Sequence, residues 1–71
     1  MILSKAKIGQ TVVVKSVEGK DKMKKFLFSL GCYEGEEITL ISILAGNYVV
    51  NIKDSRYALD ANMAKSILIQ A

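Results

Sequence analysis

KDKMKKFLFSLGCYEGE, residues 20–36, predicts a short helix with a defined end, followed by a tight turn. Four apolar residues recur at the i, i+3, i+4 and i+7 spacing of one helix face: Met23, Phe26, Leu27 and Leu30. We expect this apolar stripe to face the core, with the helix lying as a lid on the rest of the chain. Asp21 is placed to accept hydrogen bonds from free N–H groups of the first turn, and Gly31 can adopt the left-handed conformation that ends a helix.

The segments on either side of this helix predict short β-strands. Residues 10–17 contain a run of β-branched side chains that favours a strand, after a lead-in loop at residues 4–9. Residues 37–44 are largely apolar on both faces, which predicts the most buried strand of the fold. A turn at residues 45–47 leads into residues 48–53, which are predicted to complete a hairpin. The side chains of this last strand alternate, and the inward set is Tyr48, Val50 and Ile52.

The C-terminal part of the chain predicts three short elements. Residues 56–59 suit either an edge strand or a loop, and Asp60 is placed to cap a single helical turn that continues through Ala64. Residues 66–70 then predict the last strand. Pairing of the last strand with the first would close the sheet into a small barrel and remove its exposed edges.

Length and composition predict one small cytoplasmic domain, residues 1–71. A chain of 71 residues, 51% of them hydrophobic, has the size of a single domain with a small core. The sequence lacks both the run of about 18 apolar residues that a membrane span needs and the apolar segment of a secretory signal. A single cysteine excludes an internal disulfide and suits a reducing compartment. The net charge of +3 favours an acidic partner or a membrane surface but falls short of a nucleic-acid signature.

A family resemblance rests on five segments taken in order and spacing: LFSLG at 27–31, the turn to Gly35, ITLI at 38–41, YAL at 57–59, and Ala64 with ILI at 67–69. They resemble the FeoA family, in which a helix ending in Leu-x-x-Leu-Gly precedes a Pro-Gly turn, a strand, a hairpin, an Ala-Leu segment, a helical turn and a final strand. The resemblance covers nearly the whole chain. The sequence departs from it at Glu34, where the family usually has proline, and at Cys32, where it usually has an aliphatic residue.

The resemblance implies a mainly β fold, a small SH3-like barrel of about five strands, with one short α-helix after the first strand and a single helical turn before the last. It implies a non-enzymatic accessory or regulatory protein of ferrous iron uptake that binds a FeoB-type membrane transporter with a cytoplasmic GTPase domain. A similar barrel forms the C-terminal domain of DtxR-type metal-dependent repressors, so a metal-responsive regulatory domain is one alternative. A small basic barrel that binds nucleic acid is another, for which Tyr48, Arg56 and Tyr57 would have to converge. Self-association through strand edges stays open.

Residue types for catalysis or for a metal site are scarce. Histidine is absent, which removes the usual general base and the commonest transition-metal ligand. Glu34, Glu36 and Glu37 cluster near Cys32, but adjacent carboxylates at a strand entrance are usually solvated, and Fe(II) sites favour histidine with carboxylate. Cys32 itself has the position of a small buried hydrophobe. We therefore predict no catalytic residue, no bound cofactor and no metal-ligand set, and leave direct iron binding open.

The helix surface away from the apolar stripe is basic and carries one aromatic residue. On a helical wheel Phe28 lies between Lys24 and Lys25, at about 140° from Met23. Protein interfaces favour aromatic residues at their centre with charge around them, so we predict Lys24, Lys25 and Phe28 as partner-binding residues. Two alternatives stay open: the lysines form an ordinary solvated face, or Phe28 packs against the N-terminal segment or the turn at Tyr33.

Overall fold

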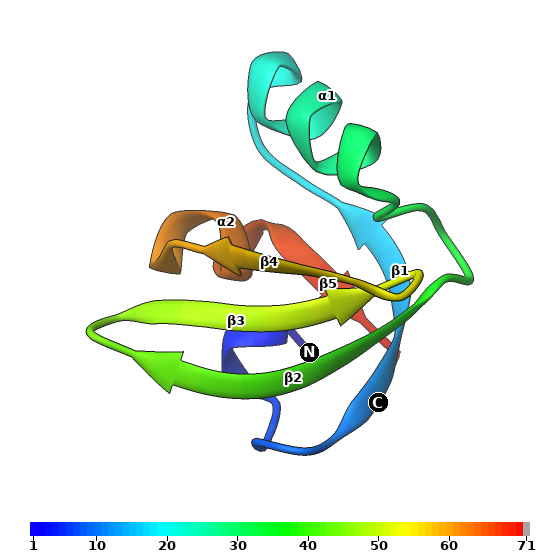
Figure 1. Ribbon diagram of the computed structural model, residues 1–71. Coiled ribbons are helices and arrows are strands. Elements are labelled where there is room, and N and C mark those ends of the chain that lie inside the picture. The colour runs from blue at the N-terminus through cyan, green and yellow to red at the C-terminus, as the bar shows by residue number, and fades with distance from the viewer. Residues whose placement is uncertain (71) are drawn as a thin grey trace.

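A five-stranded antiparallel sheet, curled around one core, forms the body of the protein (Figure 1). The computed structural model describes residues 1–70. The strands are β1 (Thr11–Val17), β2 (Glu37–Leu44), β3 (Asn47–Ile52), β4 (Ser55–Leu59) and β5 (Ile67–Ile69). Their spatial order is β4-β3-β2-β1-β5, and each neighbouring pair runs antiparallel. The predicted mainly β fold is therefore confirmed.

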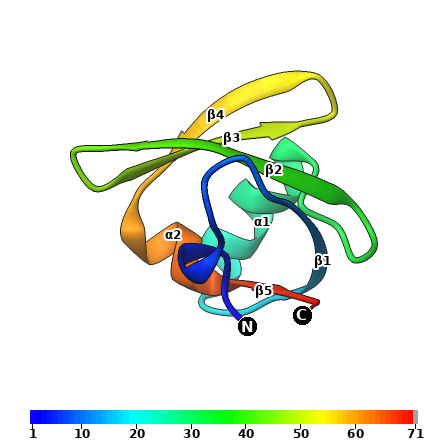
Figure 2. The same ribbon diagram turned by 90° about the horizontal axis from the view of Figure 1, so that it is seen from below.

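The first and last strands pair, as predicted. In the ladder between β1 and β5, Val17 lies opposite Ile67 and Val14 opposite Ile69. Strand β4, which the sequence left as strand or loop, is an edge strand paired with β3. The two edge strands, β4 and β5, are joined by a second helix, α2 (Ala61–Ser66), which Figure 2 shows beside them. Within residues 1–70 this helix, and no strand ladder, connects the two edges.

The predicted helix forms between β1 and β2 as α1 (Asp21–Leu30). It ends as predicted, because Gly31 adopts the left-handed conformation with φ 105° and its N–H donates to carbonyl oxygens of the last turn. The predicted cap at its start is wrong. Lys20 occupies the N-cap position without a side-chain hydrogen bond, and Asp21 is the first helical residue. The carboxylate of Asp21 still lies at the positive end of the helix dipole, where negative charge is favourable.

A capped turn begins α2, as predicted. The Asp60 Oδ1 atom accepts a hydrogen bond from the Met63 N–H at 2.9 Å. The helix runs on to Ser66 instead of ending at Ala64, so β5 begins at Ile67. Because Ala64 is fully buried, the short helix adds to the core as well as turning the chain from β4 to β5.

The core draws apolar side chains from every strand and from both α-helices. Its fully buried members are Leu3, Val14, Leu27, Cys32, Ile38, Leu40, Val50, Ile52, Leu59, Ala64 and Ile67. The inward positions predicted for the hairpin are confirmed at Val50 and Ile52, while Tyr48 packs against the core and stays partly exposed. Leu3 belongs to a 3₁₀ helix, η1 (Leu3–Lys5), where the sequence suggested only a lead-in loop. This N-terminal segment is therefore part of the folded core.

The predicted burial of β2 holds for its first half only. Ile38 and Leu40 are fully buried, whereas Ile43 and Leu44 are 40% and 64% exposed. The register with β3 shifts between Leu40 and Ser42, and from there the hairpin of β2 and β3 extends beyond the core (Figure 1).

Helix α1 contacts the core along a narrow line. Leu27 is fully buried, and Met23 and Leu30 pack partly against the core, but Phe26 is 46% exposed. The prediction that Phe26 faces the core is therefore wrong. Successive helical residues point about 100° apart. Leu27 points straight into the core, so the side chain of its neighbour Phe26 points away from it.

Candidate functional site

Helix α1 presents one phenylalanine on each side of its line of core contact. Phe26 and Phe28 are two residues apart in the helix, and their side chains therefore point about 200° apart. Phe28 faces the turn that follows the helix, and Phe26 faces α2. Each phenylalanine belongs to a separate candidate surface.

Phe28 stacks on Tyr33, and we call these two residues the aromatic pair. Their ring centroids lie 5.5 Å apart with an interplanar angle of 5°. The stack remains accessible, since Phe28 is 37% and Tyr33 50% exposed. The Lys53 Nζ atom lies 5.8 Å from the centroid of the Tyr33 ring and 3.5 Å from Glu36 Oε1. Phe28 therefore packs against the turn at Tyr33, which was one of the alternatives left open by the sequence. Its ring nevertheless remains partly exposed to solvent.

The structure places the predicted partner-binding lysines on the same helix with unequal exposure. Lys25 is exposed, whereas Lys24 is half-buried. Sequence reasoning offered the turn at Tyr33 as one neighbour of Phe28 but missed Lys53, which lies over the Tyr33 ring. The short turn after Gly31 is a local signal for Tyr33, but Lys53 arrives from the end of β3, far along the chain. The helix end and β3 approach closely, since a Cβ at Gly31 would lie 3.5 Å from Lys53 Cδ.

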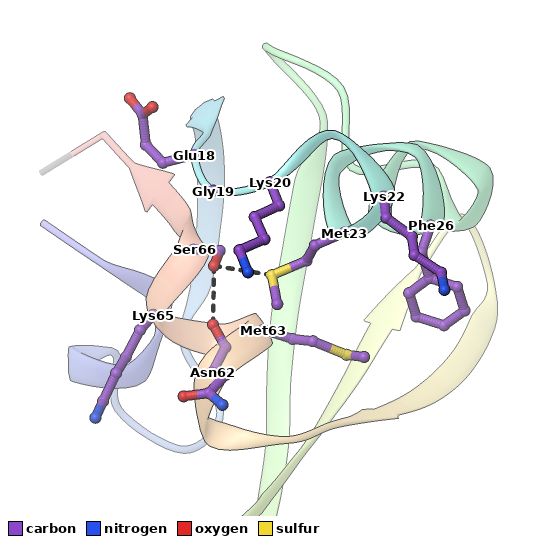
Figure 3. Close-up of a pocket in the computed structure, with 10 residues that line it drawn as sticks. All are labelled: Glu18, Gly19, Lys20, Lys22, Met23, Phe26, Asn62, Met63, Lys65 and Ser66. Atoms are coloured by element: carbon purple, nitrogen blue, oxygen red, sulfur yellow. Dashed lines mark hydrogen bonds between the residues drawn. The ribbon is translucent and has the colours of Figure 1, made fainter.

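A groove lies between the first half of α1 and α2, with a volume of about 850 Å³ (Figure 3). Apolar side chains of both helices and three lysines line it together with small and polar residues: Glu18, Gly19, Lys20, Lys22, Met23, Phe26, Asn62, Met63, Lys65 and Ser66. The Ser66 hydroxyl contacts Met23 Sδ at 3.0 Å at one end of the groove, while it also donates to the Asn62 carbonyl oxygen at 2.9 Å within α2 (Figure 3). No local sequence pattern indicates this groove, because its two walls are 43 residues apart at that contact.

Cys32 is fully buried directly after α1, which confirms its predicted role as a small core residue. Burial raises the pKa of its thiol to about 11, because the apolar surroundings disfavour the thiolate. Its N–H donates to the Leu27 carbonyl oxygen at 3.1 Å. The thiol is therefore shielded and neutral near pH 7, which is unsuited to nucleophilic chemistry.

Alkylation of Cys32 in the folded protein should accordingly be slow. A rise in pKa from 9.0 to about 11 lowers the thiolate fraction at pH 8 by about a hundredfold, and burial adds a steric barrier. We expect labelling of Cys32 by iodoacetamide at pH 8 to be at least about a hundredfold slower in the native protein than in the protein unfolded in urea. The free energy of unfolding should also fall as the pH rises from 9 towards 11, because the unfolded chain then releases a proton that the folded chain retains. Equal labelling rates in the two states would show that Cys32 is accessible.

Metal ligands and an aromatic stacking surface are not assembled in residues 1–70. No group of three His, Cys, Asp or Glu side chains there could hold a metal ion. Tyr48 and Tyr57 pack partly against the core while Arg56 is exposed, so the three residues that a nucleic-acid site would require do not share one exposed surface. As for a membrane span, none of the helices in the described part of the chain has the necessary length and apolar character.

Comparison with known proteins adds a family and a fold. A family model for the FeoA domain matches residues 1–71. FeoA of Stenotrophomonas maltophilia, a prokaryotic SH3 domain protein crystallised with zinc, is 26% identical, with 99% of this chain and 89% of that chain covered and a TM-score of 0.88. The FeoA protein of Chlorobium tepidum is 24% identical, with 99% and 69% covered and a TM-score of 0.91. The fold is therefore SH3-like, as the resemblance implied.

One further solved structure extends the comparison beyond iron transport. A manganese-dependent transcriptional repressor is 19% identical, with all of this chain and 41% of that chain covered and a TM-score of 0.90. At this identity the likeness shows the fold alone. Among curated proteins, no sequence matches this chain.

Proposed function

The chain belongs to the FeoA family, and from this premise we propose that it is an accessory protein of ferrous iron uptake that docks on a FeoB-type transporter with a cytoplasmic GTPase domain. The family is associated with iron uptake and is regulatory rather than catalytic. The Stenotrophomonas maltophilia protein is described as a candidate activating factor of bacterial ferrous iron transport. We extend that role to this chain.

The aromatic pair is the observation that supports docking through α1. Phe28 and Tyr33 form a stacked, solvent-accessible surface with the exposed Lys25 on the same helix. Because the two rings already hold each other in place, little side-chain freedom remains to be lost when a partner covers them. Aromatic side chains are also the residues that most often dominate interface energies. We therefore propose Lys24, Lys25 and Phe28, extended by Tyr33, as the docking surface.

Docking would regulate the transporter through a difference in affinity. A bound protein shifts a conformational equilibrium only to the extent that it binds one conformation more tightly than the other. The nucleotide state of the GTPase domain supplies such a pair of conformations, so the affinity of this chain should depend on the bound nucleotide.

An amide NMR titration tests the docking proposal. The labelled protein is titrated with the cytoplasmic domain of the FeoB-type transporter of the same organism, without nucleotide, with GDP and with a GTP analogue. We expect chemical-shift changes confined to α1 and the turn that follows it, larger in one nucleotide state. Changes confined to another face would contradict the proposed surface, and no change in any state at millimolar concentration would contradict docking on this domain.

Replacing Phe28 with alanine should weaken binding of that cytoplasmic domain by about tenfold, since an interface aromatic of this kind contributes upwards of 1 kcal/mol. Isothermal titration calorimetry measures the effect. Phe26→Ala is the matched control, because it removes the same ring from the opposite side of the same helix. If both variants bind as the unaltered protein does, or if Phe26→Ala is the weaker binder, the assigned surface is wrong.

A further inference from the structure

The groove between α1 and α2 has an apolar floor, in which Met23 and Met63 also pack partly against the core and Phe26 does not. Met23, Phe26 and Met63 come from the two helices and line it together. Phe26 is 46% exposed, although it lies beside the fully buried Leu27. The volume of about 850 Å³ lies in the range of clefts that hold ligands. An exposed aromatic ring within such a groove is typical of a surface that binds a partner.

Positive charge flanks this floor on the α1 side. Lys20, Lys22 and Lys65 line the groove, against the single carboxylate of Glu18. The amines of Lys20 and Lys22 lie near Met23 and Phe26, whereas the Lys65 amine and the Glu18 carboxylate point away from the floor (Figure 3). In the part of the chain that the structure describes, the ion pair found is the one between Lys53 and Glu36, so the three groove lysines have no acidic partner. A complementary occupant therefore carries carboxylates beside its apolar groups.

The two helices meet at one end of the groove. The Ser66 Oγ atom lies 3.0 Å from Met23 Sδ and 2.9 Å from the Asn62 carbonyl oxygen, so its one proton is shared between a contact to α1 and a bond within α2. Gly19 closes this end, and a Cβ there would lie 3.4 Å from Ser66 Oγ and 3.7 Å from Met23 Sδ. The backbone of Gly19 also has φ 108°, which a side chain would strain. The two walls therefore approach each other closely at this end of the groove.

The chemistry of the groove selects among classes of occupant. A small polar ligand needs fixed polar groups, but residues 1–70 contain no buried polar or charged side chain. Nucleic acid needs several aromatic rings for stacking, and Phe26 is the single ring in the groove. A membrane surface is flat, whereas these apolar groups lie recessed between two helices (Figure 3). Methionine side chains, by contrast, adapt well to the apolar side chains of a peptide.

We propose that this groove binds an amphipathic polypeptide segment of a partner protein, with apolar side chains on the floor and Asp or Glu side chains against Lys20 and Lys22. The surface is distinct from the aromatic pair, which lies on the opposite side of α1. The inference does not depend on docking to an iron transporter, because it rests on the shape and charge of the groove.

A designed peptide tests the inference directly. The probe is a fluorescein-labelled helical peptide of about four turns, roughly 14 residues, with leucines on one face and glutamates flanking them. Fluorescence anisotropy follows its binding to the full protein. We expect saturable binding that is lost when serine replaces the leucines, and that is much weaker when glutamine replaces the glutamates. Vesicles of phosphatidylglycerol and phosphatidylcholine serve as the membrane comparison.

Variants of the protein locate the site. Phe26→Ala and Lys22→Glu alter exposed groove residues and should each weaken peptide binding by about tenfold. Phe28→Ala, with the same ring removed outside the groove, and Lys7→Glu, with the same change of charge outside it, should bind as the unaltered protein does. The rate of Cys32 alkylation verifies that every variant is folded.

Three results would overturn the inference. The first is that the peptide does not bind at concentrations up to millimolar. The second is that the peptide binds both groove variants as tightly as it binds the unaltered protein. The third is that the protein does not bind the peptide but binds vesicles through Phe26 and Lys22. The transporter takes no part in this experiment, so a negative peptide result does not contradict docking on the transporter. A negative titration with the transporter domain likewise does not contradict peptide binding in the groove.

Discussion

Replacing Leu27 with alanine should lower the free energy of unfolding by about 3 kcal/mol. Leu27 is the one fully buried side chain of α1, so its removal opens a cavity where the helix contacts the core. Alanine is the best helix former, and the loss therefore reports packing and not helix propensity. A chain of 71 residues is expected to have a total stability of roughly 4 to 10 kcal/mol. The variant should lose a large part of it in urea denaturation.

The neighbouring position gives the control for this change. Phe26→Ala removes a larger side chain one residue away, but that side chain is 46% exposed and leaves no enclosed cavity, so its loss should cost only about 1 kcal/mol. Leu27→Ala should also speed the alkylation of Cys32, because both side chains are buried in the same core and a less stable fold exposes Cys32 more often. Equal stabilities of the two variants would mean that α1 is not anchored through Leu27.

The end of α1, the start of α2 and most of the strands were predictable because their signals are local. Gly31 ends α1 and Asp60 caps α2 through backbone and side-chain geometry within a few residues. The hairpin of β2 and β3 follows from alternation on either side of a short turn. Pairing of β1 with β5 was also predicted, since so apolar a chain gains from covering its strand edges.

The candidate surfaces were less predictable, because each depends on contacts between distant segments. Helical periodicity indicated an apolar face that included Phe26, but it carries no information on how wide the contact with the core is. Only the position of α2 makes Phe26 part of a groove. Similarly, the basic helix face pointed to Phe28, whereas Lys53 comes beside the aromatic pair through the close approach of Gly31 to β3.

The N-terminal segment is the clearest case of a core residue without a local signal. Leu3 ends a run of three apolar residues that is too short to show a helix or strand period, and the sequence predicted only a loop directly after it. Its position is fixed by contacts across the whole chain. The Ile69 N–H donates to the Met1 carbonyl oxygen at 2.7 Å, and Ile2 bridges to Leu68. These bonds place η1 against β5 and α2, with Leu3 fully buried (Figure 2).

Leu3→Ala should therefore destabilise the protein by about 3 kcal/mol, a loss typical of a fully buried leucine and far larger than expected for a residue of a terminal loop. Urea denaturation followed by circular dichroism measures it. Ile8→Ala is the matched control from the same N-terminal segment, because Ile8 is 61% exposed and its truncation should change the stability by less than about 0.5 kcal/mol. Hydrogen exchange should also become faster at the Ile69 amide in Leu3→Ala alone. If both variants are as stable as the unaltered protein, the N-terminal segment does not belong to the cooperative core.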